Sequence, residues 1–193
     1  TDGIRYYYSL VPAFFKLIDT LFRACAGEES SIDVRVLFRT FGDDLDDVGR
    51  EYNLYCEGLH PVHKPTGGVT FDGRTPGLLD RRIEMPNFIG KIKRSKDTSS
   101  HEELLLAHVS YERGGRTVTL TEGASHVYEM ILTQWFGVGE ESGSPLTYSA
   151  GIQDDYEFWA KNKEEAHCGK LFMVDKIEDQ GTILQLFFDD NIE

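Results

Sequence analysis

The chain has 193 residues, 33 of them acidic and 20 basic, so its formal net charge is −13 at pH 7. A surface with this charge repels nucleic acids and anionic membranes, and no apolar run of about 18 residues is present to span a bilayer. We therefore expect neither nucleic acid nor a membrane as a partner. Three cysteines without a CxxC spacing favour reduced thiols and a cytoplasmic location.

The first part of the chain alternates helical and strand patterns. Apolar residues recur every three or four positions over 9–26, which predicts an amphipathic helix. An apolar segment at 32–39 predicts a strand, and a second helical pattern follows at 44–57. Helix, strand, turn and helix in this order are typical of an α/β sheet.

The middle of the chain has a different composition. Residues 59–87 hold four of the six prolines and many glycines, which predicts a loop long enough to suggest function or mobility. Three strands are predicted next, at 88–94, 104–111 and 116–120, and a Gly-Gly turn predicts that the last two form a hairpin. We interpret these strands as an antiparallel insertion.

Helices and strands alternate again in the last third of the chain. A helical pattern occupies 124–136, a strand is predicted at 146–152, and another helix is predicted to begin at Asp154. The chain closes with an apolar run at 183–188, which suits a buried parallel strand. We expect this strand and the strand near 34–39 to be parallel in one sheet.

The predicted final strand ends in two adjacent aspartates, Asp189 and Asp190. Both would lie at the carboxyl end of the sheet, where open α/β sheets bind ligands. Adjacent carboxylates repel each other unless a cation neutralises them, and Mg²⁺ prefers carboxylate oxygens. Asp189 and Asp190 are therefore candidate magnesium ligands. The alternative is an Asp-Asp-Asn turn that only ends a strand.

Two further residues are candidates for binding a phosphate. Thr40 ends a predicted strand and Gly42 follows, so a hydroxyl and backbone N–H groups can face an anion there. The alternative is a strand end followed by a helix cap, in which Asp43 and Asp44 oppose an anion. Lys170 precedes the final strand and can reach the same end of the sheet, or it can be a solvated surface charge.

Taken in order, these motifs resemble the haloacid dehalogenase (HAD) superfamily. That family has a strand ending in Thr or Ser, then a lysine, then a strand ending in Asp-Asp. The family's lysine is commonly followed by proline, whereas Lys170 is followed by Leu171. The resemblance implies an α/β fold with a HAD-like parallel sheet flanked by helices. Residues 1–58 and 146–193 would form this core, and 59–145 would be a cap-like insertion containing antiparallel β-structure.

The resemblance also implies a function, that of a Mg²⁺-dependent phosphohydrolase-type domain acting on a small phosphorylated substrate. Thr40 would bind the phosphoryl group, and Lys170 would steady this group and the nucleophile. Asp189 and Asp190 would hold Mg²⁺. The alternative is a non-catalytic HAD-fold binding or scaffold protein.

The family's first motif, Asp-x-Asp, supplies a nucleophile and then a general acid/base. No complete copy occurs in the sequence, but Thr1-Asp2-Gly3 is similar to the end of this motif. Asp2 would then be the acid/base, and we expect the nucleophilic aspartate immediately before Thr1. Without that aspartate, the 193 residues are expected to be inactive as a phosphatase.

Two other patterns carry less weight. The segment 16–20, Lys-Leu-Ile-Asp-Thr, is superficially similar to the first HAD motif, but it lies within the predicted helix at 9–26. Cys56, His60 and His63 are side chains of the types that bind zinc, but no fourth ligand is evident near them.

Overall fold

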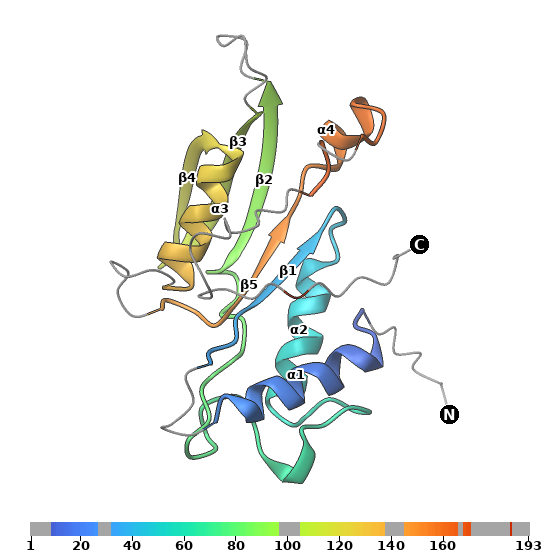
Figure 1. Ribbon diagram of the computed structural model, residues 1–193, viewed down its shortest axis with the longest axis vertical. Helices are drawn as coiled ribbons and strands as arrows, with labels where there is room; N and C mark the ends of the chain where they lie inside the picture. The colour runs from blue at the N-terminus through green and yellow to red at the C-terminus, as the bar shows by residue number, and fades with distance from the viewer. Residues whose placement is uncertain are drawn as a thin grey trace.

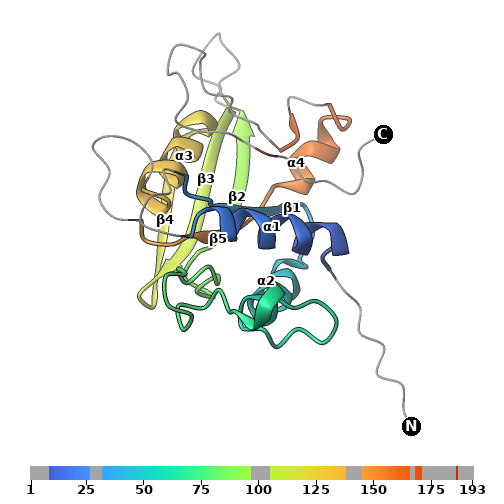
Figure 2. The same ribbon diagram turned by 60° about the horizontal axis from the view of Figure 1, so that its bottom comes forward.

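The computed structural model describes residues 9–26, 32–96, 105–137, 145–165, 168–170 and 186. Its centre is a mixed five-stranded sheet in the order β1-β5-β2-β3-β4. Helices flank this sheet on both faces (Figures 1 and 2). The predicted α/β class is therefore confirmed.

Three neighbouring strands of the sheet are parallel: β1 (Val36–Thr40), β5 (Ser149–Gln153) and β2 (Ile89–Lys96). The other two, β3 (Leu105–Arg113) and β4 (Arg116–Gly123), continue the sheet in antiparallel fashion from β2. The carboxyl ends of β1, β5 and β2 therefore point the same way.

The predicted hairpin is confirmed, and its turn explains why two glycines are needed. Gly114 and Gly115 join β3 to β4 with φ angles of 57° and 74°. Both values lie in the left-handed region that glycine adopts without steric cost, as a two-residue hairpin turn requires.

The prediction that the strand at 88–94 belongs to an antiparallel insertion is confirmed for its pairing with β3 and wrong for its pairing with β5. This strand, β2, pairs with β3 in antiparallel fashion, but its first three residues pair with β5 in parallel. One sheet thus includes strands from 59–145 and from the 1–58 and 146–193 segments. The division of the chain into a core and a cap-like insertion stays a prediction.

Helices α1 (Pro12–Ala24) and α2 (Leu45–Cys56) cover one face of the sheet next to β1 (Figures 1 and 2). Pro12 begins α1, where its fixed φ favours the first helical turn and its missing N–H costs nothing. Apolar residues of both helices meet those of the following loop in one core. Its buried members are Phe15, Ile18, Phe22, Tyr52, Tyr55, Cys56, Phe71 and Ile83.

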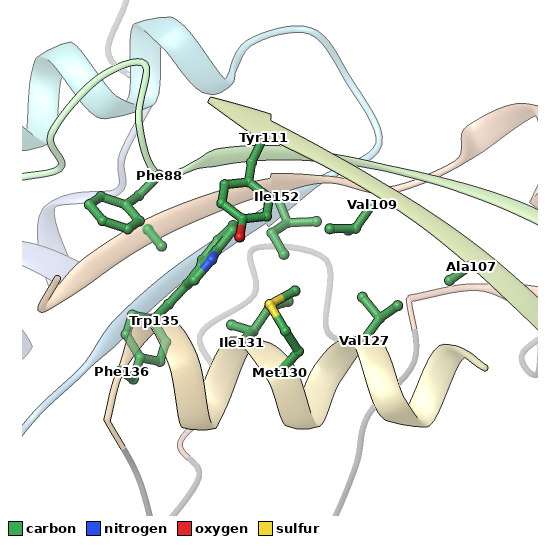
Figure 3. Close-up of a cluster of buried hydrophobic side chains, with 11 residues drawn as sticks. Phe88, Ala107, Val109, Tyr111, Val127, Met130, Ile131, Trp135, Phe136 and Ile152 are labelled. Atoms are coloured by element: carbon green, nitrogen blue, oxygen red, sulfur yellow. The ribbon is translucent and has the colours of Figure 1, made fainter. Parts of the chain in front are cut away.

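The opposite face is covered by α3 (Ala124–Met130), which continues as the π-helical turn η2 (Ile131–Trp135). Figure 3 shows the side chains of this helix pointing at the sheet, with Trp135 beside Tyr111 and Phe88. Trp135 has no solvent-exposed surface. The members of this second core are Phe88, Ala107, Val109, Tyr111, Val127, Met130, Ile131, Trp135, Phe136, Ala150 and Ile152.

The predicted loop at 59–87 contains a short 3-10 turn, η1 (Thr66–Gly68), and an isolated antiparallel bridge between Asp72 and Asp80. Hydrogen bonds also attach this loop to the helices. The hydroxyl of Thr66 donates to Asp19 in α1 over 2.7 Å. The side-chain amide of Asn53 accepts from the N–H of Ile83 at 2.8 Å and donates to its carbonyl at 2.9 Å. Side-chain hydrogen bonds and burial therefore hold this loop in place although it forms little regular backbone structure.

Two expectations concern parts of the chain beyond these elements. The predicted strand at 183–188 lies outside the described residues, apart from Leu186, so its pairing with the rest of the sheet stays a prediction. Within the described ranges, no helix has both the length and the apolar composition that crossing a bilayer requires.

A buried hydrogen-bond chain that joins α2, β5 and the 59–87 loop yields a test of the fold. Ser149 donates to the carbonyl oxygen of Arg81 at 2.6 Å, so the hydroxyl of Tyr52, 2.9 Å from Ser149, must donate to the serine. Burial raises the pKa of Tyr52 well above its usual value, which keeps this donor protonated.

We predict that Tyr52→Phe lowers the free energy of unfolding by about 1–3 kcal/mol, because a buried acceptor loses its donor. Urea denaturation at pH 7 measures the change. The control is Tyr156→Phe, which removes a hydroxyl from a side chain that is 51% exposed. It should change stability by less than about 0.5 kcal/mol. Equal losses in both variants would contradict the assigned hydrogen-bond chain.

Candidate functional site at the carboxyl end of the sheet

The carboxyl ends of β1 and β5 lie side by side. Thr40 pairs with Gln153, and the N–H of Asp154 donates to the carbonyl of Thr40 at 2.7 Å. Helix α4 (Tyr156–Lys161) follows β5 beyond this end of the sheet (Figure 1). Open α/β sheets bind their ligands at this end, which makes its reactive and charged groups the candidates for a functional site.

Asp154 and Asp155 form a buried acidic pair here, each only 6% exposed. Asp154 forms a two-pronged ion pair with Arg39: its Oδ2 lies 3.0 Å from Nε, and its Oδ1 contacts Nη2. This fork geometry is the strongest form of a carboxylate–guanidinium contact. The charge of Asp154 is thus compensated by β1 itself.

Asp155 is held by a different set of donors. It accepts hydrogen bonds from the backbone N–H groups of Arg94 at 2.9 Å and Phe158 at 3.2 Å, and the ammonium of Lys93 lies 3.4 Å away. Burial alone would raise the pKa of Asp155, but these hydrogen bonds and the lysine outweigh it and lower the pKa. The ionised carboxylate caps α4 and ties that helix to β2.

The sequence analysis missed this acidic pair as part of a site. The strand at 146–152 is followed by two aspartates, the same pattern that drew attention to 183–190, but Asp154 was assigned only to a helix start. The pattern itself could have found the pair. The local sequence does not show that Arg39, Lys93 and backbone N–H groups neutralise it.

Thr40 forms hydrogen bonds within its own turn. Its hydroxyl donates to Asp44 Oδ1 at 2.8 Å and accepts from the N–H of Gly42 at 2.9 Å. These bonds agree with a strand end followed by a turn, but Asp44, the N-cap residue of α2, forms no side-chain capping hydrogen bond. The role of Thr40 in binding a phosphoryl group stays a prediction.

Lys170 reaches this end of the sheet from far along the chain. Its ammonium donates to the carbonyl of Arg39 at 3.1 Å and lies 5.2 Å from the ring centre of Phe41. The structure therefore brings Lys170 beside the backbone that carries Thr40. Its role toward a phosphate stays a prediction.

Three aromatic rings, Phe41, Tyr156 and Trp159, form what we call the aromatic cluster. Phe41 and Trp159 stack with their ring centres 4.9 Å apart and their planes at 9°. Tyr156 meets both rings edge-on, at 6.1 Å from Phe41 and 5.9 Å from Trp159. The cluster joins α4 to the turn after β1, and Tyr156 remains half exposed.

Three residues of the predicted site, Asp2, Asp189 and Asp190, lie outside the described residues. Their predicted roles in acid/base chemistry and Mg²⁺ binding stay predictions. Among the residues that are described, no group of three or more His, Cys, Asp or Glu side chains is arranged to hold a metal ion.

The weaker zinc pattern has a structural explanation. Both ring nitrogens of His60 form hydrogen bonds: Nδ1 accepts from the N–H groups of Val62 and His63, and Nε2 lies 3.2 Å from Glu51 Oε1. Since Nδ1 is an acceptor, Nε2 carries the proton and donates to Glu51. The histidine is a buried tether between α2 and the following loop.

Comparisons with protein-family models, curated proteins and solved structures found no match. The function therefore has to be inferred from the residues and geometry of the chain.

The contacts of Asp155 predict how stability depends on pH. Its pKa is lowered in the folded state, so its contribution is complete above the unfolded value of about 3.9 and is lost as the pH falls through the folded value. We predict that Asp155→Asn costs about 1–2 kcal/mol at pH 7, because the amide has one acceptor oxygen for donors that contact both carboxylate oxygens and carries no charge for Lys93. The substitution should also flatten the loss of stability below about pH 4.

Urea denaturation at several pH values between 2 and 7 provides the measurement. Asp43→Asn is the matched control, because Asp43 is exposed and lies at the same end of the sheet. It should stay within about 0.5 kcal/mol of the unmodified chain at pH 7. If Asp155→Asn keeps the full acid sensitivity, the carboxylate does not have the stabilising role described.

Proposed function

We propose that the carboxyl end of β1 binds the phosphoryl group of a small phosphate ester, as part of a HAD-like, Mg²⁺-dependent phosphohydrolase-type domain. The observation that carries this proposal is the position of Lys170. Its ammonium lies 3.1 Å from the carbonyl of Arg39, next to Thr40. In a chain with a net charge of −13, a phosphate needs such a local cation.

The topology supports the proposal at the level of the sheet. β1 and β5 are parallel neighbours, and both end at the proposed site. Among the described residues, β5 is the one strand that pairs with β1. A larger HAD-like parallel sheet would add its further strands on the other side of β1. In this proposal, 59–145 includes the cap.

The chemistry proposed for the described residues is binding and orientation. An ammonium group has three N–H donors, and one is used on Arg39. The hydroxyl of Thr40 has one donor, now directed at Asp44, and rotation of that hydroxyl would direct it to a phosphoryl oxygen. Lys170 would supply positive charge, and the hydrogen bond from Thr40 would orient the phosphoryl group.

The described acidic pair does not fit a magnesium ion. Asp154 binds Arg39, and Asp155 accepts from two backbone N–H groups. The Mg²⁺ proposal therefore rests on Asp189 and Asp190. The bound ion would supply positive charge that stabilises the phosphoryl oxygens.

One observation favours a second candidate, a non-catalytic binding or scaffold protein on the same fold. The hydroxyl of Thr40 and the ammonium of Lys170 already form hydrogen bonds within the protein. Groups satisfied in this way can serve the turn after β1 without any ligand. Binding of phosphate distinguishes the two candidates.

We predict that inorganic phosphate binds to the chain in the presence of Mg²⁺ and that Lys170→Met weakens this binding tenfold or more. Loss of a charge-assisted hydrogen bond costs about 1.5–3 kcal/mol, which corresponds to roughly 10- to 150-fold in Kd. Isothermal titration calorimetry measures both values. Because the first HAD motif is incomplete in these 193 residues, the test is binding rather than turnover.

Lys161→Met is the matched control, since Lys161 lies on α4 at the same end of the sheet and is an exposed lysine whose ammonium lies 4.0 Å from Glu157 Oε2. It should leave the Kd for phosphate within about twofold, because it removes the same charge without removing a phosphate contact. Equal weakening of phosphate binding in both variants would show that only the net charge of the chain matters and would contradict a contact with Lys170. Absence of phosphate binding in the unmodified chain would favour the scaffold candidate.

The magnesium site is tested separately. We predict that Mg²⁺ binds weakly and that Asp189→Asn/Asp190→Asn abolishes the heat of binding, because adjacent carboxylates need a counter-charge. Asp46→Asn/Asp47→Asn is the control, because these two aspartates are also adjacent in sequence and both are exposed. Unchanged heats in the Asp189/Asp190 variant would remove the predicted metal ligands.

A further inference from the structure

The aromatic cluster lies beside the proposed phosphate site. We infer that Phe41, Tyr156 and Trp159 select a phosphate ester that carries a planar aromatic ring, of the class of nucleoside monophosphates. This inference rests on the proposed function, because it uses Lys170 as the anchor for the phosphate. It adds the chemical class of the group that the phosphate is attached to.

Phe41 connects the two halves of the inferred site. Its ring centre is 5.2 Å from the ammonium of Lys170 and 6.1 Å from the ring centre of Tyr156. The ammonium of Lys170 and the exposed ring of Tyr156 therefore both lie close to the side chain of Phe41. A ligand with a negative charge at one end and a flat apolar ring at the other matches this arrangement.

Fastening α4 does not by itself account for the cluster. This helix has two other attachments: its cap residue Asp155 binds β2, and Phe158 lies against the guanidinium of Arg94 at 5.1 Å. Tyr156 is 51% exposed, so half of its surface contributes nothing to that packing. An exposed tyrosine on a ring cluster next to a cation is a surface that a planar ring can cover.

The physics of stacking favours an aromatic ring over a sugar or an alkyl chain. A base stacked on an aromatic side chain contributes about 1–3 kcal/mol, which is roughly 5- to 150-fold in Kd. Stacking uses the face of the ring, which every nucleobase has. The cluster should therefore distinguish ring from no ring more strongly than one base from another.

The test compares adenosine 5′-monophosphate with ribose 5-phosphate, which has the same phosphate and sugar but no aromatic base. Calorimetry with the 193-residue chain and Mg²⁺ should show tenfold or tighter binding of the nucleotide. Tyr156→Ala should remove most of this preference and leave the Kd of ribose 5-phosphate unchanged. Leu59→Ala, which truncates another exposed apolar side chain remote from this site, should preserve the preference.

The Lys170→Met variant separates the two proposals. If Lys170→Met weakens the binding of both ligands equally while Tyr156→Ala weakens only that of the nucleotide, the phosphate site and the role of the aromatic cluster are both supported. If both ligands bind equally and depend on Lys170, the phosphate site stands and the aromatic inference is overturned. If neither ligand binds, or if Lys170→Met changes neither Kd, the proposed function fails and the inference fails with it.

Discussion

The arrangement of the molecule depends on strand β5, whose small side chains allow helices to pack closely on both of its faces. β5 lies between β1 and β2, and four of its five residues are buried. A Cβ atom at Gly151 would lie 2.9 Å from Leu45 Cδ1 and 3.0 Å from Ile89 Cδ1, so α2 packs against bare backbone there. Ala150 and Ile152 face the other core, beneath η2. Since protein interiors are close-packed, larger side chains at Gly151 would push α2 outward and move the turn that follows β1.

The same strand explains why the carboxyl end of the sheet is rich in paired charges. Asp154 and Asp155 directly follow β5, and both are buried where their carboxylates contact β1, β2 and α4. Buried charge is costly unless it is paired and hydrogen-bonded. Arg39 satisfies the first aspartate, and the second is satisfied by Lys93 and backbone N–H groups. Arg39 and Lys93 thus lie at the same end of the sheet as the proposed binding site for an anionic ligand. Their pairing with the aspartates fixes α4, and with it the aromatic cluster.

Buried polar tethers perform a similar role on the face covered by α1 and α2. Glu51 is 9% exposed, and its Oε2 accepts from the N–H groups of Ser9 and Leu10 just before α1. Its Oε1 faces His60, which in turn orders the start of the long loop. One carboxylate thus joins the approach to α1, the middle of α2 and the beginning of the 59–87 segment. This explains how a loop rich in proline and glycine keeps a defined path over the helices.

The sequence alone determined the elements whose signals are local. Periodicity located α1, α2, α3 and β1 to β5, although α3 ends in a π-turn, and Gly114–Gly115 marked the hairpin because that turn needs positive φ at both positions. Thr40 and Lys170 were predicted at one end of the sheet from motif order. Only the tertiary structure decided that β2 runs parallel to β5, that Asp154 binds Arg39 across 115 positions, and that Phe41, Tyr156 and Trp159 share one cluster. Periodicity reports which face of an element is buried, whereas strand neighbours and charge partners are set by contacts between segments far apart in the chain.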